Sequence, residues 1–285
     1  MEAKLLLFTN LGRNEGLKLQ QYLYLLSRRI LRNPLTYSVY EKILWSQIKN
    51  GVKPEHIGVI LDGNRRWASR RAKRPWEGHQ FGADKVEDLL MWCIDMDIKS
   101  ITIYTFSMEN FQRAPLEVEE LMRLLEERLQ RLLSDERIHD NRVQVKIIGR
   151  THLLPKSTQD IIRMVEETTA AYDSHYLTLA IAYGGRAEII DAIKKISTQI
   201  QKGQLTVSEI NEEVIEDNLY TSYLPNSEPD LIIRTSGEER LSGFLMWQSV
   251  YSELCFIDVF WPDFRRIDLW RVIRTFQQRT RRYGK

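Results

Sequence analysis

Six short apolar runs alternate along the chain with longer segments of helical periodicity, and this alternation constrains the fold more than any other feature. The runs are rich in β-branched residues and lie at Ile57–Leu61, Ser100–Phe106, Val143–Ile148, Leu177–Ala182, Leu231–Thr235 and Phe256–Val259. The helical segments, with apolar residues three and four positions apart, lie at Gly82–Met96, Leu116–Leu133, Ser157–Ala171, Ala187–Gln201 and Asp268–Arg281. Strands that alternate with helices predict an α/β fold in which helices flank one central, mostly parallel six-stranded sheet.

The chain shows no linker, internal repeat or low-complexity tract after residue 50, so residues 51–285 are predicted to form a single domain. Residues 1–50 are predicted to form an N-terminal helical extension. Leu17–Leu31 is a basic, aromatic and amphipathic stretch, and Tyr37–Lys49 carries a second helical pattern. A membrane-surface anchor would suit the first of these, but a pair of helices packed on the domain is the commoner arrangement and is the one we favour.

The composition is that of a soluble globular protein, because 43% of the residues are hydrophobic and the most apolar segment, 244–261, is interrupted by charged residues. The two cysteines, Cys93 and Cys255, lie far apart in apolar segments, as expected of core residues in a reducing compartment. We therefore expect a cytoplasmic protein, with peripheral membrane contact at most. A net charge of +2 gives no reason to expect a nucleic-acid partner. The arginine-rich C-terminal end suits either a solvated helix face or an anionic partner.

The strongest candidate site follows the first apolar run, where the sequence continues as Asp62, Gly63, Asn64, Arg65 and Arg66. Helix N-capping would explain the aspartate alone. It would not explain a glycine that lets the backbone approach a ligand, followed by two guanidinium groups that fit phosphate oxygens. A carboxylate, a glycine turn and a helix start therefore predict a pocket for an anion together with a metal ion.

Two further polar segments follow predicted strands. One contains Ser107, Glu109, Asn110 and Arg113, and the other contains Arg234, Arg240 and Ser242. The first segment leads into a predicted helix, and the needs of a helix start explain only the residues in the second half of that segment. The second segment is either a surface turn with scattered charge or a diphosphate site with charge-assisted hydrogen bonds. Because ligands of parallel sheets bind beyond the carboxyl ends of the strands, all three segments are expected to meet at one rim.

Two single residues add to these segments. Glu253 lies among aromatic residues, where an ionised carboxylate is costly unless it is paired or bound to a metal; a helix-surface position is the alternative. His79 follows a glycine at a predicted helix start, where it is either structural or a donor to phosphate.

Together these segments resemble the cis-prenyltransferase family of the undecaprenyl diphosphate synthase type. Seven blocks carry the resemblance in one order from Pro54 to Gly284: HIGVILDGNRRWA, GHQFGA, YTFSMENFQR, AYGGRAEI, DLIIRTSGEERLSGFLMWQSVYSELCF, WPDF and RRYG. The resemblance implies a homodimeric or heterodimeric enzyme, of which we expect the homodimer, that uses Mg²⁺ to extend an allylic diphosphate with isopentenyl diphosphate and forms Z double bonds. The helical trans-type synthases use aspartate-rich motifs, and no DDxxD occurs here.

The resemblance also implies residue roles. Asp62 would be the catalytic carboxylate and, with Glu253, a metal ligand. The allylic diphosphate would be bound by Gly63, Asn64, Arg65, Arg66, Trp67, Arg74 and His79, and the isopentenyl diphosphate by Arg234, Arg240, Leu241 and Ser242. The reacting centre would be lined by Ser107, Met108, Glu109, Phe111 and Arg113, with Asn110 at the proton-acceptor position. Arg282 and Gly284 would reach the site of the neighbouring subunit.

In the reaction that this resemblance implies, diphosphate departs with growing negative charge, which Mg²⁺ and arginines stabilise. A neutral amide is a very weak base, so Asn110 is expected to orient a relay with Ser107 and His79, with a diphosphate oxygen as a candidate base. The growing chain needs a tunnel between the sheet and Leu116–Leu133 or Leu89–Met96, although these residues also suit an ordinary core.

The expected product is a polyprenyl diphosphate, the precursor of a glycosyl carrier lipid. One alternative is prenyl transfer to an acceptor other than isopentenyl diphosphate, and Arg234 and Arg240 argue against it. The other is a non-catalytic partner subunit of a heteromeric enzyme. The presence of Asp62, Arg66 and Glu253 argues against that alternative.

Overall fold

The structure is a computed structural model of the chain and describes residues 34–279. Its internal contacts separate residues 1–50 from residues 51–285. In the first unit, α2 (Pro34–Ile48) coincides with the second predicted helix, whereas Leu17–Leu31 lies outside the described residues. The assignment of residues 1–50 as a separate extension stays a prediction. Between residues 34 and 279, no helix is long and apolar enough to cross a membrane.

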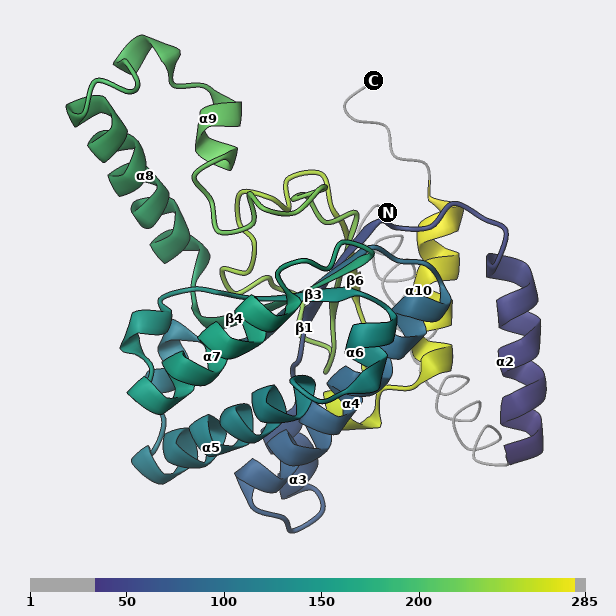
Figure 1. The fold of residues 1–285 in the computed structure, drawn as a ribbon. Coiled ribbons are helices and arrows are strands. Elements are labelled where there is room, and N and C mark those ends of the chain that lie inside the picture. Colours follow the sequence, from purple (N-terminus) through teal and green to yellow (C-terminus); the bar gives the residue numbers. More distant parts are fainter. Residues whose placement is uncertain (1–33, 280–285) are drawn as a thin grey trace, which may run out of the picture. The chain divides into compact units, whose positions relative to one another are not determined.

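The second unit is built around a parallel sheet of six strands, which confirms the predicted fold class (Figure 1). The strands are β1 (His56–Ile60), β2 (Ser100–Ser107), β3 (Val143–Ile148), β4 (His175–Tyr183), β5 (Leu231–Arg234) and β6 (Glu253–Phe256), in the spatial order β3-β4-β2-β1-β5-β6. Every neighbouring pair is parallel, so the carboxyl ends of all six strands lie along one edge.

The five predicted helices of this unit are all present, a short helix begins at the helix start expected after Gly63, and two further short helices were not predicted. The helices are α3 (Asn64–Ser69), α4 (Pro75–Asp95), α5 (Pro115–Leu132), α6 (Glu136–Asp140), α7 (Lys156–Thr169), α8 (Gly185–Gln201), α9 (Glu212–Glu216) and α10 (Arg266–Gln278). Four 3₁₀ turns complete the unit: η1 (Met108–Gln112), η2 (Thr151–Leu153), η3 (Val207–Glu209) and η4 (Trp261–Asp263). The missed helices are too short to carry a helical repeat.

The sixth strand begins three residues earlier than predicted, at Glu253 rather than Phe256. Its first residue pairs with Leu231 at the amino end of β5. Ile257 and Val259, which suggested a strand, lie beyond the ladder, and their carbonyls accept hydrogen bonds from the turn after β5: Ser236 N–H donates to the Val259 carbonyl at 2.8 Å and Gly237 N–H to the Ile257 carbonyl at 2.9 Å. The prediction was wrong in position because Ile257 and Val259 carry the apolar signal of a strand, whereas their carbonyls pair with the turn after β5 and not with a neighbouring strand.

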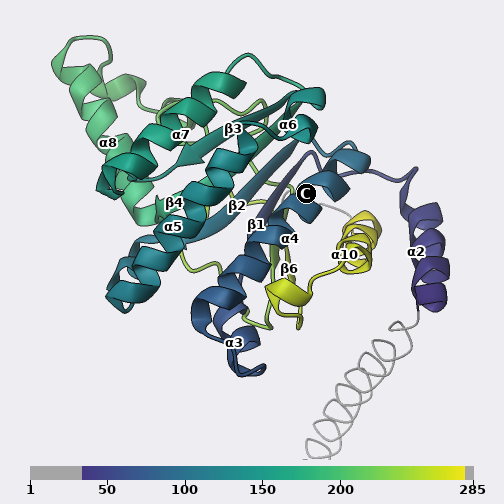
Figure 2. The same ribbon diagram turned by 60° about the horizontal axis from the view of Figure 1, so that its bottom comes forward.

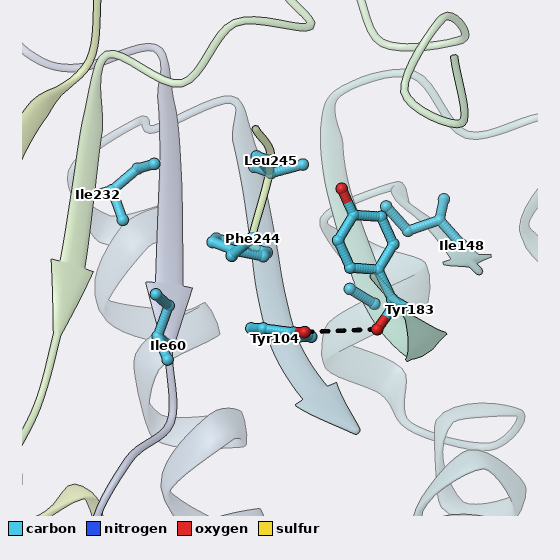
Figure 3. Close-up of a cluster of buried hydrophobic side chains, with 8 residues drawn as sticks. Ile60, Tyr104, Ile148, Tyr183, Ile232, Phe244 and Leu245 are labelled. Carbon is cyan, nitrogen blue, oxygen red and sulfur yellow. Dashed lines mark hydrogen bonds between the residues drawn. The ribbon is translucent and has the colours of Figure 1, made fainter. Parts of the chain in front are cut away.

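Different elements cover the two faces of the sheet. Figure 2 shows α4, α5 and α7 side by side along one face. On the other face, Phe244 and Leu245 pack against residues of β1, β2 and β4 in a buried cluster (Figure 3). Within it, the rings of Tyr104 and Phe244 stack at 5.0 Å, and the Tyr104 hydroxyl donates to the Tyr183 carbonyl at 3.3 Å. Burial on both faces explains why the central strands are apolar throughout.

Two glycines position the segment after β1. Gly63, with φ of 102°, turns the chain into α3, and a Cβ atom there would lie 2.7 Å from the Phe260 ring. Gly78 lies on α4, where a Cβ atom would lie 2.2 Å from the backbone oxygen of Asn64. Because backbone cannot yield as a flexible side chain does, Gly78 sets how closely α4 packs on the first turn of α3.

We therefore expect Gly78→Ala to lower the free energy of unfolding by about 1–3 kcal/mol, the usual cost of overpacking. Urea denaturation followed by circular dichroism would measure it. Gly184→Ala is the matched control, because its added Cβ atom would meet only Met108, at an ordinary 3.6 Å. Equal stability of the two variants would contradict the close-packing argument.

Candidate active site

The carboxylate of Asp62 is held between two arginines from different segments. Arg234, at the end of β5, donates to Asp62 Oδ2 from Nη2 at 2.8 Å and from Nε at 3.3 Å. Arg66, one turn into α3, donates to Asp62 Oδ1 at 3.1 Å. The Arg234 side chain is almost buried, whereas that of Arg66 remains about half exposed. One carboxylate thus balances two cations at the carboxyl end of the sheet.

The backbone of Asp62 is also fixed. Its N–H donates to the Thr235 hydroxyl at 3.0 Å, and that hydroxyl in turn donates to the Asp62 carbonyl oxygen at 2.7 Å. The same carbonyl accepts the Trp261 N–H at 3.0 Å. Thr235 is fully buried and was not predicted as a site residue. Its place directly after Arg234 was the available signal.

Helix capping does not explain Asp62. The N-cap residue of α3 is Gly63, and no side chain caps this helix. Partial burial would raise the pKa of Asp62, but the hydrogen bonds and charges of Arg234 and Arg66 outweigh it and hold that pKa below its usual range. Asp62 is therefore ionised at neutral pH and can bind a cation.

One cavity, of about 610 Å³, surrounds the loop after β1. It is lined by Leu61, Asp62, Gly63, Asn64, Arg65, Arg66, Ser69, Pro75, His79 and Arg113. Six of the predicted substrate-binding residues line it, together with Asp62. Three arginines and a glycine turn make this cavity suited to a diphosphate.

His79 is neutral in this cavity. Burial and the nearby charges of Arg113 and Arg65 lower its pKa to about 3. Its Nε2 lies 3.4 Å from Arg113 Nη1, which donates to Glu117 Oε1 at 3.0 Å. The buried Glu117 also lies 3.6 Å from Arg65 Nε. Glu117 was not predicted, and it orients two of the arginines that face the cavity.

A second, larger cavity of about 1090 Å³ lies beside the first, and Asp62 lines both. Besides Asp62, the predicted residues in its wall are Asn64, His79, Ser107, Met108, Glu109, Asn110, Arg113, Arg234, Leu241 and Ser242. Ser242 accepts a hydrogen bond from Arg234 Nη1 at 2.9 Å. Arg150 and Arg186 also line this cavity. They were not predicted, because both lie outside the three polar segments that follow β1, β2 and β5.

A third cavity, of about 160 Å³, is mostly apolar and is lined by α4, α5 and strands of the sheet. Its lining includes Leu90, Leu121, Met122, Leu125, Leu129 and Leu132 from the helices and Leu177, Leu179 and Ile181 from β4. Leu61, Asn64, His79 and Thr105 line both this cavity and the larger polar one. The predicted helix α5 therefore does form a cavity wall, whereas only Leu90 of the predicted Leu89–Met96 takes part.

Four predicted site residues lie apart from these cavities. Trp67 is buried and donates from Nε1 to Asp263 at 2.8 Å. Arg74 precedes α4 with its guanidinium over the Trp76 ring, and Phe111 packs edge-to-face on Phe106. Arg240 faces Glu238, which also accepts from Arg66 Nη1 at 3.1 Å. Arg282 and Gly284 lie outside the part of the chain that the structure describes.

Glu253 is also not brought to Asp62 within one chain. It is the first residue of β6 and is level with Leu231, about 10 Å along the strands from Arg234. Its Oε2 accepts a hydrogen bond from Arg279 Nη1 at 2.6 Å. Glu253 therefore lies neither on a helix surface nor beside Asp62, the two positions that the sequence suggested. A shared metal site for the two carboxylates stays a prediction that a single chain does not satisfy.

The described residues fit a magnesium ion that binds together with a phosphate ligand. Across residues 34–279, no group of three or more histidine, cysteine, aspartate or glutamate side chains could hold a metal by itself. Mg²⁺ prefers one or two carboxylates, with phosphate oxygens and water as its other ligands. Asp62, ionised and open to both polar cavities, provides such a carboxylate.

Comparisons with known proteins agree with this site. Residues 60–284 match the family model described as putative undecaprenyl diphosphate synthase. A tritrans,polycis-undecaprenyl-diphosphate synthase (geranylgeranyl-diphosphate specific) of Methanopyrus kandleri is 49% identical over 91% of this chain and 97% of its own length. The enzyme of the same name from Pyrococcus horikoshii is 47% identical over 87% of this chain and 94% of its own length.

Two solved structures are also similar. Lavandulyl diphosphate synthase from Lavandula x intermedia, in complex with dimethylallyl diphosphate, is 34% identical with a TM-score of 0.79, over 82% of this chain and 99% of that one. A probable undecaprenyl diphosphate synthase from Campylobacter jejuni is 31% identical with a TM-score of 0.67, over 82% and 100%. The chain therefore belongs to the undecaprenyl diphosphate synthase family and is a cis-prenyltransferase.

Proposed function

We propose that this protein is a Mg²⁺-dependent synthase that adds isopentenyl diphosphate units to an allylic diphosphate and produces a polyprenyl diphosphate with Z double bonds. One observation carries the proposal: two polar cavities share Asp62, and an apolar cavity adjoins them through Leu61, Asn64, His79 and Thr105. Two diphosphates and one hydrocarbon chain are the ligands that this arrangement suits.

In this assignment the allylic diphosphate occupies the cavity around Arg65 and Arg66, with its hydrocarbon chain directed between α4 and the sheet. Isopentenyl diphosphate occupies the cavity of Arg234 and Ser242. Asp62 lies between the two diphosphates and keeps Arg66 and Arg234 oriented before either substrate binds. Pre-oriented charges stabilise the leaving diphosphate without reorganisation during the reaction.

The allylic C–O bond breaks, the double bond of isopentenyl diphosphate forms the new C–C bond, and a proton leaves. Mg²⁺ bound by Asp62 and diphosphate oxygens would supply further positive charge to the leaving group. Asn110 Oδ1 accepts the Ser107 N–H at 3.1 Å, so Asn110 holds the turn after β2 in place. A diphosphate oxygen is the better base, because the amide is not basic and the pKa of His79 is about 3.

Two rivals remain distinguishable. Transfer to a different acceptor would not need the Arg234 and Ser242 cavity, and a non-catalytic partner subunit would not need an ionised Asp62. We also propose geranylgeranyl diphosphate as the primer, because relatives at 44–49% identity carry that specificity in their names. The lipid product then outgrows the apolar cavity, which favours a cytoplasmic enzyme working at a membrane surface.

We further propose that residues 51–285 form the catalytic domain and that two copies form a homodimer. Exposed apolar side chains support an interface: Ile190 and Ile193 of α8 and Met246, Val250 and Tyr251 of the segment before β6. Gly185, at the start of α8, packs on Met246, so the two groups adjoin. In a dimer, Arg282 and Gly284 of one chain would complete the site of the other.

The proposal is tested by incubating the purified full-length chain with labelled isopentenyl diphosphate and geranylgeranyl, farnesyl, geranyl or dimethylallyl diphosphate. We expect Mg²⁺-dependent chain extension, fastest with geranylgeranyl diphosphate, and loss of extension with excess chelator. Product length follows from chromatography and double-bond geometry from nuclear magnetic resonance. No incorporation with any primer, despite a folded protein, would contradict the proposal.

For Asp62→Ala we expect turnover to fall by roughly a hundredfold or more. The Mg²⁺ that stabilises the leaving diphosphate would lose its carboxylate ligand, and Arg66 and Arg234 would lose their common partner. The variant should still fold, because Arg234 keeps its hydrogen bonds to Ser242 and to the Arg240 carbonyl, but its thermal midpoint should fall, since a nearly buried guanidinium loses its charged partner. Steady-state kinetics at saturating Mg²⁺ would measure the loss. A variant that keeps more than about a tenth of the wild-type rate would exclude this role.

For Arg240→Ala we expect a loss of about 1.5–3 kcal/mol of charged hydrogen bonding, or roughly ten- to a hundredfold, mainly in the apparent affinity for isopentenyl diphosphate. Arg240 must first exchange Glu238 for the substrate. Initial rates at varied concentrations of each substrate separate the two affinities. An equal loss for both substrates would contradict the assignment of separate cavities.

Deletion of residues 282–285 should lower turnover strongly and leave the thermal midpoint nearly unchanged. Deletion of a merely solvated basic end would also leave the midpoint unchanged, because exposed charges contribute little to stability, but it would leave turnover unchanged as well. Mixing the truncated chain with Asp62→Ala chains gives the sharper test, since a mixed dimer has one site with both an intact Asp62 and an intact tail. Recovery of activity supports donation of the tail between subunits, and no recovery despite demonstrated subunit exchange opposes it.

A further inference from the structure

The apolar cavity contains one pair of charged side chains. The α4 residues that line it are His79, Gly82, Ala83, Val86, Glu87 and Leu90, and those of α5 are Leu121, Met122, Leu124, Leu125, Arg128, Leu129 and Leu132. Among these lining residues, Glu87 is the single acidic residue of α4 and Arg128 is the single arginine of α5. Arg128 Nη1 donates to Glu87 Oε1 at 3.1 Å, directly between the two helices.

The bridge continues beyond this pair. Arg128 Nη2 lies 2.6 Å from Asp84 Oδ1 on α4, and Arg137 of α6 donates to Glu87 Oε2 at 3.0 Å. Arg128 is one-fifth exposed, and its buried Nε has no hydrogen-bond partner. An incompletely satisfied guanidinium in an apolar wall costs stability, so packing alone is a poor explanation for it.

The cavity is too small for a long product. Its volume of about 160 Å³ is close to the ~150 Å³ of an engineered apolar cavity that holds a single benzene molecule. A chain of many isoprene units fits only if α4 and α5 move apart. Arg128 lies about 20 Å beyond Pro115 along α5, so a growing chain passes the residues near the site before it meets the bridge.

We propose that the bridge of Arg128 with Glu87 and Asp84 limits the separation of α4 and α5 and thereby sets the upper length of the product. This inference rests on the proposed chain-extending function. Short intermediates occupy the cavity with the bridge closed, as Figure 2 shows α4 and α5 side by side. Further extension requires α4 and α5 to move apart, and the bridge opposes this movement. Release of the product then competes with addition of the next isoprene unit.

The test compares product lengths at excess isopentenyl diphosphate. Arg128→Met keeps an apolar stem of similar length and removes the charge, so we expect its main product to be longer than that of the wild type by at least a single isoprene unit. Arg128→Lys keeps one charged contact and should restore a length near that of the wild type. Unchanged or shorter products for Arg128→Met would overturn the proposal.

Two controls separate this effect from general loosening. Arg123→Met removes an exposed α5 ion pair with Glu120 that lies outside the cavity, and Lys146→Met removes a bridge from β3 to Glu166 of α7. Neither should lengthen the product, and lengthening in both would overturn the proposal. If Arg128→Met fails to fold, as judged by its thermal midpoint, Glu87→Gln decides by the same criterion. Absence of any product from the wild type would instead refute the proposed function.

Discussion

Arg234 and Arg66 bind the same carboxylate, that of Asp62, and this shared contact joins the end of β5 to the loop after β1. Without it, an almost buried guanidinium would lose its charged partner, and Arg66 would keep only Glu238 and Ser236 as partners, neither of which lies on the loop after β1. Thr235 and Trp261 fix the Asp62 backbone by hydrogen bonds to its N–H and its carbonyl. The two polar cavities exist on either side of Asp62 because the carboxylate is held in place, ionised, at their common wall.

The helices α4 and α5 give this rim its second property. An enzyme for amphiphilic substrates needs a charged region that opens directly onto an apolar one, and the face of α4 from His79 to Leu90 makes that transition within about three turns. Gly78 brings the start of α4 onto α3, so the cavity at the loop after β1 and the apolar cavity share a wall. The Glu87–Arg128 bridge then lies where that wall meets α5.

Sequence patterns were most reliable where one segment by itself determines the outcome. Long periodic helices and apolar strands were predicted correctly, because burial of one face or both faces leaves a local signature. The sixth strand was displaced because Ile257 and Val259 carry a strand-like apolar signal, although their carbonyls pair with the turn after β5 and not with a ladder. Trp67 was expected at the substrate, yet its indole faces Asp263, since a six-residue helix gives no indication of which side it buries.

The sequence alone determined the fold class, the order of strands and helices along the chain, and the three polar segments that end β1, β2 and β5. Parallel strands place such ends on one edge, so their meeting followed from topology. Only the tertiary structure showed that Asp62 is shared by Arg66 and Arg234, that Thr235 and Glu117 support the site, and that Glu253 lies at the opposite ends of the strands. Those facts depend on register and side-chain direction between segments far apart in sequence, and no local pattern encodes them.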